Sequence, residues 1–125
     1  MNIHGKEYHF LLTVGTTRAI SKLCPENNIA NIGMIFEGKD TDKMIDTIAE
    51  LSAAMSEGYE MRKKFMEQGY EPHPITKEEI YTLTIQELED LQKEIMNEIG
   101  AGMETEIEAE PDKNGKKNEN LKVLN

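Results

Sequence analysis

The sequence predicts a mostly helical α+β domain, in which an N-terminal β-hairpin packs on three to four helices. Three observations support this fold class: an alternating apolar pattern near the start, helical spacing of apolar residues from residue 40 onwards, and paired helix-capping motifs after that. The 125 residues include 38% hydrophobic residues and no Trp, which is enough for one modest core of Ile, Leu and Met. We predict that residues 1–103 form this domain and that residues 104–125 form a polar tail.

The hairpin is predicted from a turn and the strand after it. His4 and Gly5 suit the two central positions of a tight turn, because glycine tolerates a positive φ. After the turn, apolar residues alternate along one face of a strand that Gly15 is expected to end: Tyr8, Phe10, Leu12 and Val14. Since two strands alone are marginally stable, we expect the hairpin to pack on helices or to pair with another chain through its free edge.

A short helix is predicted after the hairpin. Thr16 or Thr17 is the expected N-cap, and the helix should reach Leu23 and stop before Pro25. Residues 26–39 mix apolar side chains with Asn and Gly, and they fit either a short helix or a strand followed by a turn.

A long central helix is predicted to begin at Asp40 or Thr41, either of which is a suitable N-cap. We expect Gly58 to weaken or divide this helix and Gly69 to end it. Its apolar residues recur at spacings of three and four: Ile45, Ile48, Leu51, Met55 and Tyr59.

Two further helices are predicted beyond an extended connection at Pro72 and Pro74. Their starts are marked by two capping boxes: Thr76 with Glu79, and Thr84 with Glu87. They share an apolar stripe: Ile80, Leu83, Leu88, Leu91, Ile95 and Ile99. Gly100 and Gly102 are expected to close the last helix. The tail beyond Met103 is too polar to offset its ordering entropy, so we expect it to be disordered.

Charge and targeting patterns narrow the classes of function. The formal net charge of −10 repels phosphate backbones, so we expect no nucleic-acid binding. Cys24 is the only cysteine, which suits a reducing compartment. The N-terminal residues lack the basic and apolar regions of a signal peptide, and no apolar run approaches the ~18 residues of a membrane span. We therefore expect a cytoplasmic protein without membrane contact.

No catalytic, metal or cofactor site is predicted. Cys24 lies beside Pro25 without a nucleophile motif, and we interpret it as a buried or half-buried structural thiol. His4 and His9 lack the Cys or Asp companions of a metal site. Two pairs of carboxylates are interpreted as solvated helix surface: Glu57 with Glu60, and Glu78 with Glu79. The sequence thus indicates a binding protein and not an enzyme.

The eight Met residues fit two roles, core filling or an adaptable apolar surface that repacks against partners. Under the second interpretation, the predicted partner-binding residues are taken from the helical stripes: Met44, Ile48, Met55, Tyr59, Met66, Leu88, Leu91 and Ile95.

The order of these segments resembles that of a known family. HGKEYHFLLTVG, LSAAMSEGYEM and ITKEEIYTLTIQELEDL resemble the opening hairpin, central helix and paired capped helices of phage tail assembly chaperones of the G-type, from long-tailed phages of Gram-positive hosts. EIEAEPDKNGKKNEN is similar to their polar C-terminal tail. The resemblance implies a protein of the host bacterial cytoplasm that coats the tape-measure protein, recruits tail-tube subunits and is absent from the mature virion. Multiple weak contacts along one long partner, with possible self-association, fit this role.

Other functions remain open from the sequence. A structural head–tail connector or minor tail protein would persist in purified particles. An acidic regulator or DNA mimic would bind a DNA-handling enzyme with strong salt dependence. The family resemblance also raises the hypothesis of a longer, frameshifted form, for which the codons of residues 115–117 would have to contain a slippery purine run.

Overall fold

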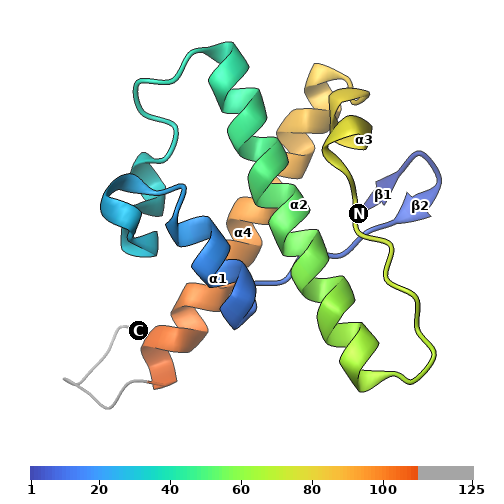
Figure 1. Ribbon diagram of the computed structural model, residues 1–125. Helices are drawn as coiled ribbons and strands as arrows, with labels where there is room; N and C mark the ends of the chain where they lie inside the picture. The colour runs from blue at the N-terminus through green and yellow to red at the C-terminus, as the bar shows by residue number, and fades with distance from the viewer. Residues whose placement is uncertain (110–125) are drawn as a thin grey trace.

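The computed structural model describes the backbone of residues 1–109 and the side chains of residues 1–103. It confirms the mainly helical α+β class, with α2 at the centre and α1, α3 and α4 packed around it (Figure 1). The elements follow in chain order: β1 (Asn2–Ile3), β2 (Lys6–Glu7), α1 (Val14–Ser21), the 3-10 helices η1 (Pro25–Asn27) and η2 (Ile29–Met34), α2 (Thr41–Met66), α3 (Lys77–Tyr81) and α4 (Ile85–Ala109). Most of the tail that we predict to be disordered lies outside the described residues.

The hairpin turn is confirmed, but its strands are shorter than predicted. β1 and β2 pair antiparallel, and the turn between them holds His4 at φ 53° and Gly5 at φ 84°. β2 ends at Glu7, so the prediction of a strand reaching Val14 is wrong. The chain beyond β2 runs across the core and keeps the predicted alternation at Tyr8 and Phe10, which are buried, but not at Val14, which begins α1 and is 89% exposed.

The first helix begins three or four residues earlier than predicted. Thr13 is its N-cap, because the Thr13 Oγ1 accepts a hydrogen bond from the Thr16 N–H at 3.1 Å. The prediction of Thr16 or Thr17 as the cap is therefore wrong, and Thr16 is instead buried within the first turn. The open assignment of residues 26–39 resolves into η1, η2 and a turn.

The helix α2 is capped by Asp40, whose Oδ1 accepts from the Lys43 N–H at 3.0 Å. It continues without a break through Gly58, so the prediction that this glycine divides the helix is wrong. The chain turns after Met66 with Gly69 at φ 85°, which agrees with the predicted stop.

Both capping boxes form as predicted. The Thr76 N–H donates to Glu79 Oε1 at 2.8 Å, and the Thr84 N–H donates to Glu87 Oε1 at 2.9 Å. The helix α4 then passes both of its glycines and continues to Ala109, so the prediction that Gly100 and Gly102 close it is wrong. The predicted domain boundary after residue 103 falls inside this helix.

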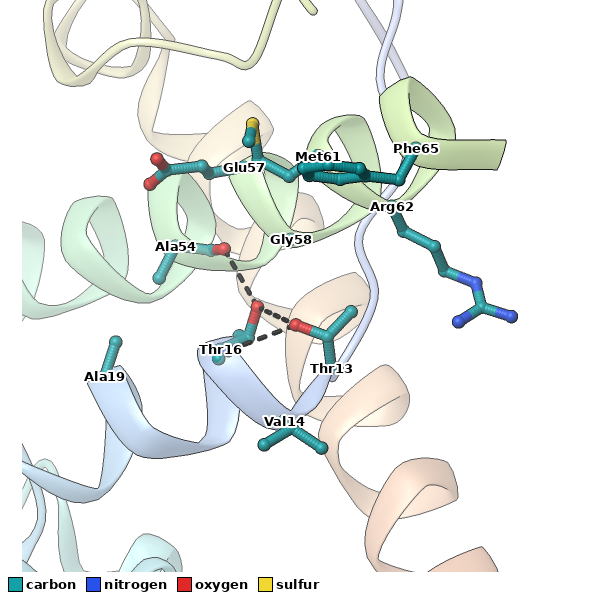
Figure 2. Close-up of a pocket in the computed structure, with 11 residues that line it drawn as sticks. Thr13, Val14, Thr16, Ala19, Ala54, Glu57, Gly58, Met61, Arg62 and Phe65 are labelled. Carbon is teal, nitrogen blue, oxygen red and sulfur yellow. Dashed lines mark hydrogen bonds between the residues drawn. The ribbon is translucent and has the colours of Figure 1, made fainter. Parts of the chain in front are cut away.

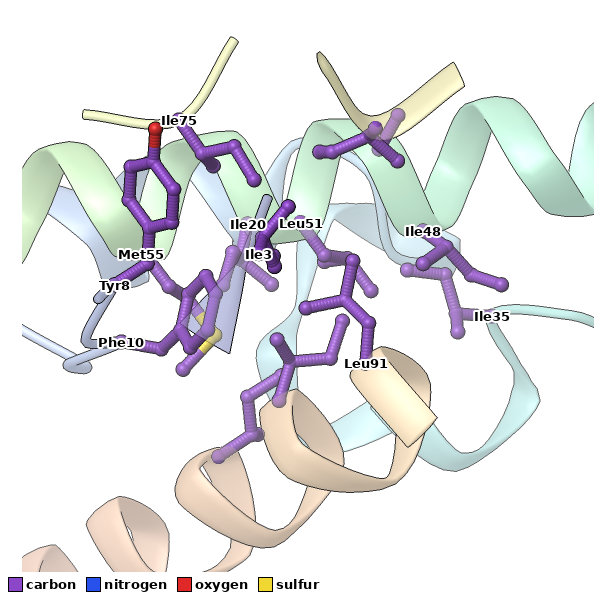
Figure 3. Packing of buried hydrophobic residues seen from close by; sticks show 14 of the residues in the cluster. Ile3, Tyr8, Phe10, Ile20, Ile35, Ile48, Leu51, Met55, Ile75 and Leu91 are labelled. Atoms are coloured by element: carbon purple, nitrogen blue, oxygen red, sulfur yellow. The ribbon is translucent and has the colours of Figure 1, made fainter. Parts of the chain in front are cut away.

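The core lies between α2 and α4 and is covered by the hairpin end, α1 and η2 (Figure 3). Most residues of the two predicted stripes are buried in it, whereas Ile45, Tyr59, Leu83 and Leu88 are only partly buried. Its fully buried large side chains include Tyr8, Ile20, Ile35, Leu51, Met55, Ile80, Leu91, Ile95 and Ile99. Tyr8 also donates through its hydroxyl to Glu79 Oε2 at 2.9 Å, and this bond links the hairpin end to α3.

Two buried serines on α2 provide a matched test of hydrogen bonding in this core. Ser56 Oγ accepts from the Ile75 N–H at 2.9 Å, whereas Ser52 Oγ has no partner within the described part of the chain. We expect Ser56→Ala to lower the free energy of unfolding by about 1–3 kcal/mol, because it leaves a buried N–H unpaired. Ser52→Ala should be neutral or stabilising, because it removes a buried hydroxyl that has no protein partner. Denaturant unfolding of both variants measures the difference, and equal losses would contradict it.

Candidate functional site

The predicted partner-binding residues lie mostly inside the protein. Four of them are core residues that offer no surface to a partner in this fold: Ile48, Met55, Leu91 and Ile95. Met44, Tyr59 and Leu88 are half-buried, and only Met66 is largely exposed, at 71%. The helical period thus identified the side of each helix that faces the core.

Large apolar side chains outside the predicted partner-binding set are exposed at another place. Val14 at the start of α1 is 89% exposed, and Phe65 near the end of α2 is 82% exposed. They flank an open groove of about 580 Å³ between the two helices, which we call the α1–α2 groove (Figure 2). Its lining combines small, apolar and charged residues: Thr13, Val14, Gly15, Thr16, Ala19, Ala54, Glu57, Gly58, Met61, Arg62 and Phe65.

The groove exists because α1 approaches α2 very closely at its floor. A Cβ placed on Gly58 would lie 2.1 Å from Thr16 Oγ1, so only glycine allows this approach. Thr16 Oγ1 donates to the Ala54 carbonyl at 3.2 Å and accepts from Thr13 Oγ1 at 3.0 Å (Figure 2). The Leu11 N–H donates to the Met55 carbonyl at 3.2 Å just before the helix. These bonds fix the floor, while the longer side chains stand at the rim.

A second cluster surrounds Glu60, which is buried, so its interpretation as solvated surface is wrong. Its side chain is 3% exposed, and Oε1 accepts from the Tyr70 hydroxyl and from the His73 N–H at 3.1 Å. The hydrogen bond to Glu60, together with burial, raises the pKa of Tyr70 to about 12. Together with Ser56 one turn earlier, Glu60 accepts hydrogen bonds from backbone N–H groups of the extended connection before α3. We therefore assign this cluster a structural role.

The remaining chemically reactive side chains are dispersed. His4 Nε2 lies 2.7 Å from Thr82 Oγ1, and the His9 ring packs on Tyr59 with 4.7 Å between centroids. Cys24 is buried, and burial raises the pKa of its thiol. Among the residues that the structure describes, no group of three or more His, Cys, Asp and Glu side chains is arranged to hold a metal ion.

The residues that build the Glu60 cluster and the α1–α2 groove carried only a faint signal in the sequence. Ser52, Ser56 and Glu60 recur every four residues, which is the spacing of one helix face, and this face precedes a proline-rich connection that needs backbone partners. Phe65 falls beyond the predicted stripe, directly after the basic residues 62–64, and this position marks an apolar residue that the core does not require.

Similarity to known proteins does not indicate a function for this chain. No helix in the described part of the chain is long and apolar enough to cross a membrane. No family model, curated protein or solved structure matches the chain.

Proposed function

We propose that this chain is a phage tail assembly chaperone that binds helical segments of the tape-measure protein in the α1–α2 groove. In this role it shields the tape-measure protein in the host cytoplasm, recruits tail-tube subunits and leaves before the virion is complete. The observation that supports the proposal is the groove itself, where Val14 and Phe65 stand 89% and 82% exposed on opposite walls.

The dimensions of the groove suit a helix. Its α2 wall extends from Ala54 to Phe65, which corresponds to about 16 Å at about 1.5 Å per residue, or three turns of a bound helix. An amphipathic helix would place apolar side chains at spacings of three and four against Val14, Met61 and Phe65. Removing these side chains from water is favourable by about 25 cal/mol per Å² of apolar surface.

The surface outside the groove suits a protein that keeps a sticky partner soluble. A long tape-measure helix exposes apolar faces before the tail tube encloses it, and exposed apolar patches promote aggregation. A coat of subunits with a net charge of −10 each would repel neighbouring complexes. Many weak contacts along one chain would together hold the coat in place through multivalency.

The proposal predicts a gene for a long tape-measure-like protein just downstream, and co-expression with that protein tests the proposal. We expect that protein to be soluble only with this chain and to co-purify with many copies of it. The double variant Val14→Asp/Phe65→Asp should reduce the co-purified amount at least about tenfold, because both walls then carry a desolvation cost. Ile85→Asp is the matched control, since Ile85 is 65% exposed but lies outside the groove, and it should bind normally.

Two results would reject this function. If the double variant captures the tape-measure-like protein as well as the Ile85→Asp control does, the groove is not the binding site. If purified virions contain the chain in stoichiometric amounts, it is a structural tail or connector component and not a chaperone.

A further inference from the structure

The apolar walls of the α1–α2 groove have no cover among the residues that the structure describes. Val14 and Phe65 remain 89% and 82% exposed there. The groove lining holds one anion and one cation, Glu57 and Arg62, so its net charge favours neither sign of occupant. An occupant therefore gains most by placing apolar side chains against these walls.

The helix α4 brings the end of the described chain close to this groove. Gly102 lies directly against Leu12, since a Cβ added at Gly102 would be 2.8 Å from Leu12 Cδ2. Leu12 precedes Val14 of the groove by two residues, and Figure 1 shows the last turns of α4 near the start of α1. From Gly102 the helix continues to Ala109, which is about 10 Å at about 1.5 Å per residue. Residues 110–125 therefore continue the chain from a point near one end of the groove.

The sequence of residues 110–125 contains one short apolar cluster. Its only aliphatic side chains are Leu121, Val123 and Leu124, and the rest is polar or charged apart from one proline and one glycine. Such a segment has too little to bury to form a core of its own, but it can bind a surface that is already formed. The twelve residues from Ala109 to Leu121 can span at most about 40 Å, which exceeds the roughly 16 Å length of the groove wall on α2 together with the last 10 Å of α4.

We propose that residues 121–124 of the same chain occupy the α1–α2 groove when no partner is bound, with their aliphatic side chains against Val14 and Phe65. A segment on a short tether has an effective concentration on the order of 1 mM, so a contact with a Kd near 1 mM is formed in about half of the molecules. A partner helix then has to displace this segment, which shields the groove until a partner that buries more apolar surface arrives. The contact uses the groove of the proposed function but does not depend on the tape-measure protein.

Paramagnetic relaxation in the full chain tests this contact without any partner. A nitroxide is attached to the variant Asn125→Cys, and labelling of the folded chain is confined to position 125 because Cys24 is buried. The amide signals of Gly15 and Phe65 should lose at least about half of their intensity, since the segment is expected to be bound about half of the time. The signal of Ile85, which lies outside the groove lining, should lose much less.

Two variants of the labelled chain separate a specific contact from mere proximity. The test variant replaces the three aliphatic residues with serine: Leu121→Ser/Val123→Ser/Leu124→Ser. The matched control replaces three polar residues of the same tail with serine: Asn114→Ser/Asn118→Ser/Asn120→Ser. The signal losses at Gly15 and Phe65 should fall at least about threefold in the test variant, because the apolar surface that holds the contact is gone, and they should persist in the control.

Three results would overturn the proposal. The first is an equal loss at the groove amides and at Ile85, and the second is a loss at the groove that survives removal of the three aliphatic residues. The third comes from mixing spin-labelled chain with ¹⁵N-labelled chain that carries no nitroxide, where losses at full strength would assign the groove to the tail of a second copy. The proposed function is judged separately, since capture of the tape-measure-like protein can succeed or fail whether or not this contact forms.

Discussion

Gly58→Ala is expected to lower the free energy of unfolding by at least about 2 kcal/mol, although alanine favours a helix by about 1 kcal/mol over glycine. The added Cβ would lie 2.1 Å from Thr16 Oγ1 and 3.2 Å from the Leu11 carbonyl oxygen. Thr16 is buried, and its hydroxyl is already bonded to the Ala54 carbonyl, so α1 itself must move away from α2. Overpacking of this kind costs about 1–3 kcal/mol and more where backbone must shift.

Gly100→Ala is the matched control for that experiment. Gly100 also lies within a long helix, but a Cβ there has no neighbour within 4 Å, so only the gain in helix propensity remains. This variant should be stabilised by about 0.5–1 kcal/mol. Denaturant unfolding of the two variants should therefore give opposite signs. A stabilised Gly58→Ala variant would show that α1 does not contact α2 as closely as described.

Glu60→Leu is expected to cost about 2–4 kcal/mol of unfolding free energy. The leucine fills the buried space but leaves the Tyr70 hydroxyl and the His73 N–H without their acceptor. Glu60→Gln keeps one carbonyl oxygen on the same side chain, so its loss should be clearly smaller. Equal losses for the two variants in denaturant unfolding would contradict the assignment of Glu60 as the acceptor that holds this connection.

The Glu60→Gln substitution should also change the ionisation of a tyrosine. In the folded chain the pKa of Tyr70 is raised to about 12, mainly by its hydrogen bond to the Glu60 carboxylate. Because the folded pKa exceeds the ordinary value of 10, this stabilisation is complete below pH 10 and is lost as the pH rises towards 12. In Glu60→Gln, tyrosinate absorbance should show one tyrosine titrating at lower pH. Tyr81, whose pKa is raised mainly by its hydrogen bond to Asp46, should stay unchanged as an internal reference, whereas the pKa of Tyr8, which burial raises most and Glu60 least, should fall only slightly.

Most of the helical architecture is predictable because it depends on local rules. The capping boxes at Thr76 and Thr84 depend on residues three positions apart, and the core stripes of α2 and α4 depend on helical period alone. The alternation after the hairpin predicted burial correctly at Tyr8 and Phe10 but not at Val14, and it predicted strand pairing that does not form. A period of two requires only an extended chain with one buried face, and β2 ends at Glu7 without altering that face.

The features that build the groove depend on contacts between distant segments, and sequence spacing does not encode them. Gly58 resembles a helix breaker until α1 is known to lie against it, 42 positions from Thr16 in the chain. Val14 continues an apolar alternation, yet as the first residue of α1 it points into solvent. Four predicted partner residues were chosen because they recur at helical spacing: Ile48, Met55, Leu91 and Ile95. They are buried, because the apolar residues with the most regular helical spacing are the ones that face the core.

Site-specific photocrosslinking tests most directly whether the α1–α2 groove binds the tape-measure protein. A photoreactive phenylalanine analogue at position 65 retains the ring that forms one wall of the groove, and the same analogue at position 85 provides an exposed apolar control. Both variants are irradiated during co-expression with the tape-measure-like protein. We expect a covalent adduct with that protein from position 65 and little or none from position 85. Equal adducts from both positions, or an adduct from position 85 alone, would contradict it.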